Sequence, residues 1–169
     1  MNEVTSRARE ATGSINQPTR VPLQTIGRLQ LVTGAGLLVY WTLFFTVGLA
    51  PPEPPFGYFV FEHSFTIADT TLGLALIRAG TWLLSEDAVR QSRGRALSLV
   101  CAGALLFLGM LDISFNALNG VYSLSVDGVV AMMINAWCIG FGALSAWACA
   151  KPPTTLSLTR SSAQPGRVF

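Results

Sequence analysis

Charged residues are scarce in this chain. Of its 169 residues only 12% are charged whereas 51% are hydrophobic, and the mean hydropathy is +0.50. Soluble domains usually carry about 25% charged residues, so this chain has about half of the charge that normally covers a water-exposed surface. The composition argues against a soluble enzyme, a nucleic-acid-binding protein and a disordered chain, and the length fits one domain.

Sequence motifs of common catalytic and redox sites are also missing. No two of Cys101, Cys138 and Cys149 form the C-x-x-C pair that a thiol oxidoreductase would use. The chain contains no phosphate-binding G-x-x-x-x-G-K-[ST], no H-E-x-x-H and no G-x-S-x-G. We therefore expect no cofactor, assign no catalytic residue or metal ligand, and expect the cysteines to be small buried side chains.

Long apolar runs are what the sequence does have. The run 29–50 contains no charged residue, and at 1.5 Å per residue it reaches about 33 Å, enough for a bilayer core of about 30 Å. Three further runs, 58–84, 96–120 and 127–150, contain only isolated ionisable residues. Four such spans with short connections predict an all-α integral membrane protein, an up-down four-helix bundle with four transmembrane helices.

The segments on either side of this predicted bundle are polar. Residues 1–28 and 151–169 are rich in Ser, Thr, Arg and Pro, so we predict largely disordered cytoplasmic tails around a bundle over 29–150. The polar lead and the first apolar run are both too long for a signal peptide, which favours a retained first helix.

Basic residues predict the orientation in the membrane. All 11 Lys and Arg residues fall on one side of a four-span arrangement. Those closest to the predicted spans are Arg28, Arg78, Arg90, Arg93, Arg95 and Lys151. By the positive-inside rule both termini are cytoplasmic, and the compact design with short loops suits the plasma membrane of a bacterium, its inner membrane.

Aromatic residues are expected at both predicted interfaces. Those expected at the outer one are Phe56, Tyr58, Phe59 and Phe61. Tyr40, Trp41 and Trp137 lie deeper, where we expect packing between helices or contact with lipid.

Polar residues inside the predicted spans are informative because a lipid-exposed carboxylate costs at least about 2.5–3.5 kcal/mol at mid-membrane. Those that helical spacing brings together in the outer half of the bundle are Glu62, His63, Thr66, Asp69, Asp112, Asn116, Asn119 and Asn135. His63 points about 100° away from Glu62 and is expected at the rim. No Lys or Arg lies at these depths, so we predict an outward-facing pocket lined by acids and amides.

The state of these acids is open at this point. They are either protonated and hydrogen-bonded to the amides, or ionised around a bound cation, or solvated by water from the outer side. Hydrogen bonds between helices that serve only packing are a further alternative.

Three functions fit this pattern. The first is a binding protein that takes a cation or a polar-headed lipophile from the outer side. The second is a membrane-embedded lipid-modifying enzyme with two carboxyls as acid and base. The third is an accessory or assembly subunit of a membrane complex.

Small residues at helical spacing indicate where helices can pack closely, within this chain or against another membrane protein. Ala136-x-x-x-Gly140 permits close helix approach and leaves a homo-oligomer or a membrane partner open, whereas Gly34-Ala35-Gly36 is expected to pack closely against another helix of the bundle. The expected partners are therefore the lipid bilayer, a small ligand and further membrane protein, without nucleic acid.

Overall fold

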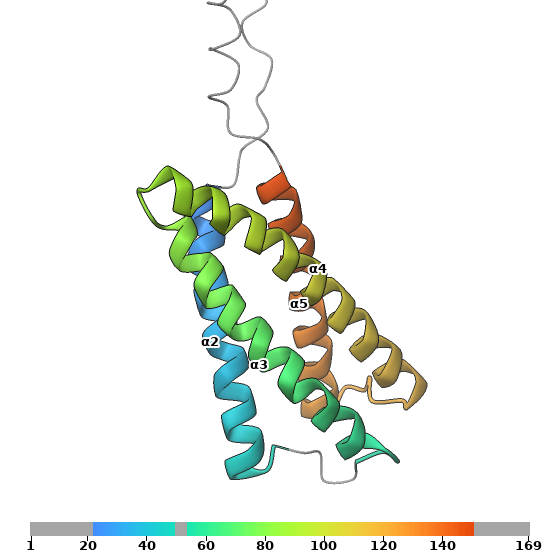
Figure 1. Cartoon of the computed structure of the whole chain (residues 1–169). Coiled ribbons are helices and arrows are strands. Elements are labelled where there is room, and N and C mark those ends of the chain that lie inside the picture. The colour runs from blue at the N-terminus through green and yellow to red at the C-terminus, as the bar shows by residue number, and fades with distance from the viewer. Residues whose placement is uncertain (1–21, 50–53, 151–169) are drawn as a thin grey trace, which may run out of the picture.

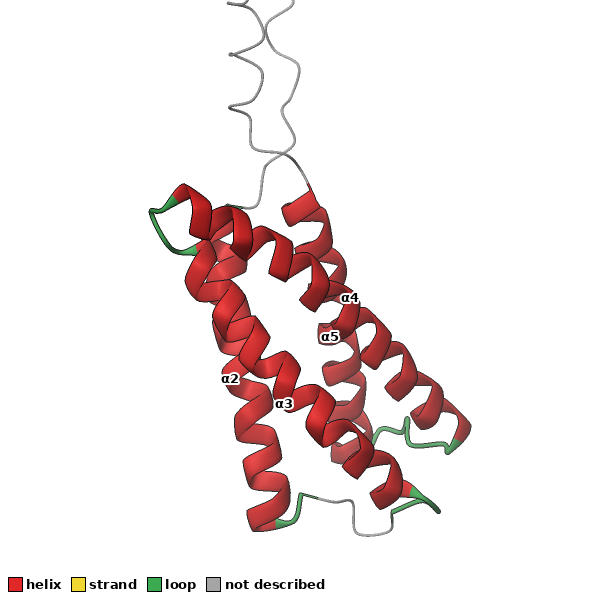
Figure 2. Cartoon of the chain, in the orientation of Figure 1, coloured by secondary structure: helices red, strands yellow, loops and turns green. Residues whose placement is uncertain are grey.

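The computed structural model describes residues 22–49 and 54–150, and every regular element in these ranges is an α-helix (Figure 2). The helices are α2 (Leu23–Val47), α3 (Tyr58–Leu83), α4 (Ala88–Leu118) and α5 (Val126–Ala150). Successive helices run in opposite directions (Figure 1). The predicted all-α fold with four helices is thereby confirmed.

Three of the helices, α2, α4 and α5, are long and apolar enough to cross a membrane. This indicates a membrane-embedded protein. Helix α3 has 26 residues and so matches the others in length, but Glu62, Asp69 and Arg78 make it less clearly apolar. Its two acidic residues line a pocket inside the molecule, so part of this polarity points away from the outer surface.

Two helices begin earlier than the apolar runs predicted. Helix α2 begins at Leu23 instead of residue 29, because Arg28 ends an apolar run without ending a helix. Helix α4 begins at Ala88 instead of residue 96, where the Asp87 side chain accepts hydrogen bonds from the Val89 and Arg90 backbone N–H groups at 2.8 and 3.3 Å. The expected connection over 85–95 is therefore mostly helical. Of the predicted tails, residues 1–21 and 151–169 lie outside the described residues.

The four helices pack in chain order as an open ring. Helix α2 packs along α3, α3 along α4 and α4 along α5, whereas α2 and α5 contact each other only slightly. A hydrogen bond of 3.1 Å from Trp137 Nε1 to Thr33 Oγ1 bridges them, and Ile26 of α2 shares a buried apolar cluster with Ala148 and Cys149 of α5. The ring is thus closed weakly on one side.

Paired glycines allow the backbones of α2 and α3 to approach closely. A Cβ atom on Gly34 would lie 2.5 Å from the Gly73 carbonyl oxygen, and one on Gly80 would lie 2.6 Å from the Gly27 carbonyl oxygen. The expected close packing is therefore confirmed at Gly34. It is wrong at Gly36, where an added Cβ would meet nothing within 4 Å because this residue faces outward.

A layer of apolar side chains fills the middle of the ring. It consists of buried residues of α3, α4 and α5, with Leu37 of α2 packed against them. We call it the apolar layer: Leu72, Leu76, Cys101, Leu105 and Phe141.

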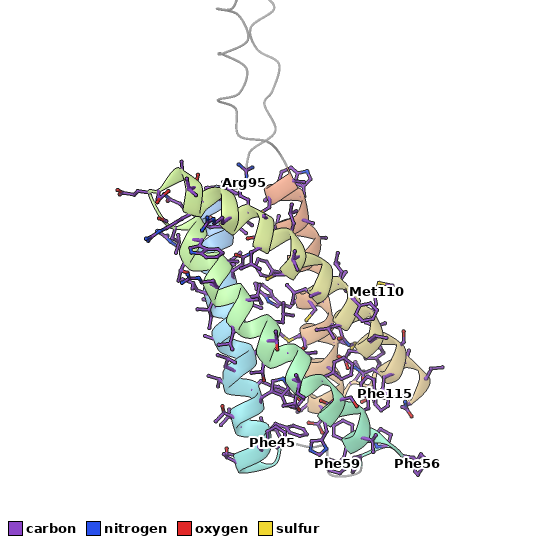
Figure 3. The ribbon with its side chains drawn as sticks, in the orientation of Figure 1. Phe45, Phe56, Phe59, Arg95, Met110 and Phe115 are labelled. Carbon is purple, nitrogen blue, oxygen red and sulfur yellow. The ribbon has the colours of Figure 1, made fainter. Side chains whose placement is uncertain are left out.

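The two ends of the bundle differ in chemistry. Helix ends bring Arg28, Arg78, Arg90, Arg93 and Arg95 to the same end, which we call the arginine end. Figure 3 shows Arg95 at this end and Phe45, Phe56 and Phe59 at the opposite one, which we call the aromatic end. The predicted grouping of the cations therefore agrees with the helix order, while Lys151 lies outside the described residues.

Candidate functional site

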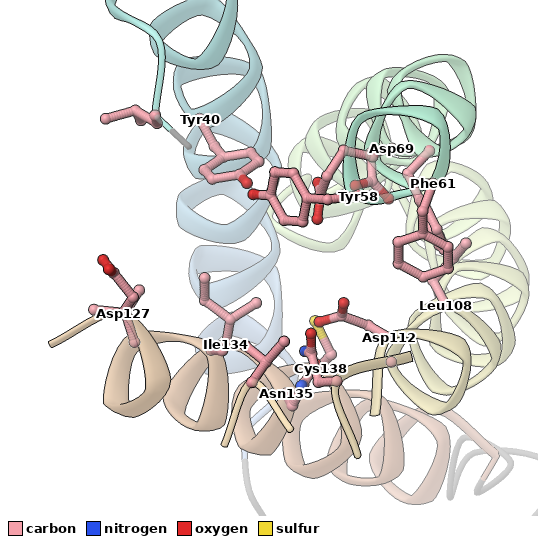
Figure 4. A pocket seen from close by; sticks show the side chains of 18 of the residues that line it. Tyr40, Tyr58, Phe61, Asp69, Leu108, Asp112, Asp127, Ile134, Asn135 and Cys138 are labelled. Atoms are coloured by element: carbon pink, nitrogen blue, oxygen red, sulfur yellow. The ribbon is translucent and has the colours of Figure 1, made fainter. Parts of the chain in front are cut away.

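A pocket of about 580 Å³ opens at the aromatic end of the bundle. All four helices contribute to its lining, together with residues just after α2 and α4. Figure 4 shows Tyr40 and Tyr58 on one side of it, facing Asp112, Ile134 and Asn135 on the other. Small-molecule sites in proteins commonly have volumes of about 300–1,000 Å³, so the pocket is large enough for a small organic ligand.

Four carboxyl groups line this acidic pocket. Glu62 and Asp69 come from α3, Asp112 from α4 and Asp127 from α5. The Asp69 carboxylate accepts a hydrogen bond of 3.2 Å from Trp41 Nε1, and the Asp112 carboxylate lies next to the Asn116 and Asn135 side chains. The lining contains no Lys, Arg or His among the described residues, so protein side chains offer these acids hydrogen bonds but no countercharge.

Asn135 is the most deeply buried amide of the pocket, with 3% of its surface exposed. Its Nδ2 group donates a hydrogen bond of 2.7 Å to the Tyr122 hydroxyl in the turn before α5. Its Oδ1 atom is buried and has no hydrogen-bond partner. A buried amide oxygen without a partner is costly, and here it belongs to a residue that lines the pocket.

Aromatic rings make up much of the remaining wall. The rings that line the pocket are those of Tyr40, Trp41, Tyr58, Phe61 and Phe65. Phe61 also stacks on Phe115 of α4, with ring centroids 3.9 Å apart and planes 9° apart. This stacked pair joins α3 and α4 beside the pocket.

The structure brings together five of the eight predicted site residues. Glu62, Asp69, Asp112, Asn116 and Asn135 line the pocket. These are the residues whose helical spacing placed them on inward faces, and they come from three different helices.

The other three predicted residues do not line it. His63 is exposed and stacks against Phe45 at 5.6 Å between ring centroids, since it lies one residue beyond Glu62 and so on another face of α3. Asn119 is exposed at the end of α4, where Nδ2 donates to the Phe115 carbonyl oxygen at 2.8 Å. The Thr66 hydroxyl is buried away from the pocket without a hydrogen-bond partner.

Sequence reasoning missed Asp127 and the aromatic rings as pocket residues. Tyr40 and Trp41 were expected to pack between helices or meet lipid, and Trp41 is indeed buried, but both rings line the acidic pocket. One signal was available in the sequence, because a buried Trp N–H needs an acceptor and Asp69 supplies it. Tyr58 and Phe61, expected at the interface, line the pocket as well.

The pocket is closed toward the arginine end. The apolar layer lies between the acidic pocket and that end, with Leu76 fully buried and Leu105 and Phe141 nearly so. Between the apolar layer and the arginine end lies a separate polar contact, in which Ser98 Oγ lies 3.2 Å from Gln30 Oε1. The acidic pocket therefore does not open at the arginine end.

The carboxyl groups of the pocket are spread around its wall. Within the described residues no three His, Cys, Asp or Glu side chains come together as a group that could hold a metal ion. What the acids surround instead is a space the size of a small organic molecule.

Fold and site together define a helical, membrane-embedded type of protein with an internal acidic pocket. Comparisons with family models, with curated proteins and with solved structures found no match. The function is therefore inferred from the pocket itself.

Proposed function

We propose that this chain is a small plasma-membrane protein that binds a ligand in its acidic pocket. The ligand is a cation or a lipophile with a polar, positively charged head. The observation that carries the proposal is a set of four carboxyl groups around one cavity whose lining supplies no positive charge. Burying several acids together is unfavourable because each loses hydration and repels the others. A bound cation offsets both costs.

The buried amide supports a ligand over simple packing between helices. If the polar residues served packing alone, their hydrogen-bonding groups would be expected to pair with each other. Asn135 Oδ1 has no such partner although its side chain is almost completely buried. An ammonium or hydroxyl group of a ligand would satisfy it.

The positive-inside rule supports an outward-facing pocket. The arginine end carries five arginines in the described part of the chain, which favours the cytoplasmic side for that end and for both termini. The acidic pocket opens at the opposite end and would then face the outside of the cell. The apolar layer between the pocket and the arginine end favours binding from one side over passage through the bundle.

Cys138 offers a test because it lines the pocket and is partly exposed. Cys101 and Cys149 are replaced by alanine, and the chain is placed in right-side-out membrane vesicles. The rates at which Cys138 reacts with cationic trimethylammonioethyl methanethiosulfonate and with anionic sulfonatoethyl methanethiosulfonate are compared, each relative to a small free thiol. We expect the cationic reagent to be favoured about ten-fold or more, since a cleft of one charge sign concentrates counter-ions.

Neutralising the acids should remove this preference. Asp69→Asn and Asp112→Asn are each expected to lower the cation-to-anion rate ratio about three-fold or more. Glu86→Gln is the matched control, because Glu86 is an exposed acid at the arginine end, and it should leave the ratio unchanged. A wild-type chain with no charge preference, or equal ratios in all folded variants, would overturn the proposal. The same preference in the purified chain would separate binding from a role that needs a partner subunit.

A further inference from the structure

The size of the acidic pocket and the spread of its carboxyl groups narrow the type of cation that it can bind. Glu62, Asp69, Asp112 and Asp127 line the wall of a cavity of about 580 Å³ without forming a metal-binding group. A water molecule takes about 30 Å³ in the liquid, so a bare inorganic ion would leave most of this cavity to water. The dimensions fit a cation whose charge is carried by a larger organic group.

The walls suit such a group. Tyr40, Trp41 and Tyr58 lie with the acids around the cavity, and the Trp41 indole is held in place by its hydrogen bond to Asp69. Aromatic faces attract organic ammonium groups through their quadrupoles, and carboxylates supply the countercharge. A pocket that combines both favours an amine or quaternary ammonium over a strongly hydrated metal ion.

The pocket also opens sideways, between α2 and α5. Leu49, Val130 and Ile134 line the cavity and yet expose 42%, 48% and 43% of their surface. They are the rim of a gap between two helices that contact each other only slightly, and the Trp137–Thr33 hydrogen bond closes this gap farther toward the arginine end. On the α3–α4 side, by contrast, the Phe61 and Phe115 rings stack on each other and join the two helices.

The rim of this gap is apolar although the cavity behind it is acidic. Helices α2 and α5 both have the length and composition to cross a membrane, so the gap between them faces lipid where they do so. An apolar chain can lie across Leu49, Val130 and Ile134 without losing contact with hydrocarbon, while a charged group reaches the acids inside.

From these observations we infer that the ligand is an amphiphilic organic cation: one amine or quaternary ammonium group on an apolar body. The ammonium group lies among Asp69, Asp112 and the aromatic rings, and the apolar body leaves through the gap between α2 and α5. This inference rests on the proposed function, because it requires that the acidic pocket binds cations.

The test measures how well defined probes protect Cys138 from the cationic methanethiosulfonate, with the chain in lipid nanodiscs and Cys101 and Cys149 replaced by alanine. The probes are decyltrimethylammonium, tetramethylammonium, calcium ion and the neutral carbon isostere of decyltrimethylammonium. We expect decyltrimethylammonium to protect at about ten-fold lower total concentration than tetramethylammonium, because its chain also gains an apolar environment. The isostere, which lacks the charge, should not protect.

A substitution in the rim separates the gap from simple enrichment of the probe in the bilayer. Ile134→Trp fills the gap and should bring the protecting concentration of decyltrimethylammonium close to that of tetramethylammonium. Met133→Trp is the matched control, since Met133 is exposed on the same helix without lining the pocket, and it should keep the difference. Tetramethylammonium, which needs no gap, should protect both variants equally.

Each outcome decides between the two proposals. If tetramethylammonium or calcium protects as well as decyltrimethylammonium, the pocket binds cations from water and the inference on ligand type is wrong. Equal protection by the neutral isostere would also overturn it, as would an unchanged difference in Ile134→Trp. If no cation protects and Cys138 shows no preference for cationic reagents, the proposed function itself fails.

Discussion

Asn135 is held by one contact and left open at another. Its Nδ2 group is fixed by the Tyr122 hydroxyl, while Oδ1 has no partner in spite of its burial. An unsatisfied buried acceptor costs about 1–3 kcal/mol. The proposed cationic ligand would satisfy this group, which lies beside Asp112.

Gly34 provides a prediction for packing between helices. Gly34→Ala places a methyl group 2.5 Å from the Gly73 carbonyl oxygen, so the backbones of α2 and α3 must separate. We expect the folded state to lose about 1–3 kcal/mol, as in other overpacked contacts. Unfolding in mixed micelles by increasing SDS measures this loss.

The control for this prediction lies two residues along the same helix. An added Cβ at Gly36 meets nothing within 4 Å, so Gly36→Ala should unfold at the same SDS fraction as the wild type or a higher one. Equal stability of the two variants would contradict the close contact between α2 and α3.

Whether the position of a side chain can be predicted from the sequence depends on how unfavourable it would be for that side chain to face lipid. Glu62, Asp69 and Asp112 were predictable because an acid exposed to lipid is so unfavourable that an inward position follows from the sequence. Tyr40 and Trp41 were not, because aromatic rings are stable in lipid, in a helix interface or in a pocket wall. His63 was expected at the rim because of its angle to Glu62, and this angle carries it onto an exposed face outside the lining of the pocket.

At the scale of helices, an apolar run in the sequence does not have the same bounds as the helix that contains it. The runs predicted the number and order of the helices correctly, since membrane hydrocarbon requires about 20 apolar residues per crossing. They did not predict where α2 and α4 begin, because hydrogen bonds can continue a helix into polar sequence. For α4 the deciding residue is Asp87, whose side chain caps the first turn.

This cap leads to a prediction at the arginine end. Asp87→Ala removes the acceptor for the Val89 and Arg90 amides, which should cost about 1 kcal/mol locally and raise their hydrogen-exchange rates about five-fold. Hydrogen exchange with mass spectrometry over the first turns of α4 measures the change. Glu86→Ala removes a neighbouring exposed acid that is not the cap, and identical exchange in both variants would contradict the capping role of Asp87.

At the scale of the whole molecule, charge and packing are arranged along the same axis. Arginines gather at one end, carboxyl groups surround a cavity at the other, and the apolar layer separates the two. The order of the spans predicted the grouping of the cations, and helical spacing predicted the inward position of the acids. Neither could reveal the open ring, because which pair of helices packs weakly depends on side-chain fit between α2 and α5 and not on the pattern of either helix.

The central claim is that the acidic pocket holds a positively charged group. It is tested most directly by a crystal structure of the chain with decyltrimethylammonium carrying bromine at the end of its chain. The account predicts density for the ammonium group between Asp69 and Asp112, and anomalous density for bromine in the gap beside Val130 and Ile134. An ammonium group lying outside the pocket, at the lipid interface of the aromatic end, would contradict the claim.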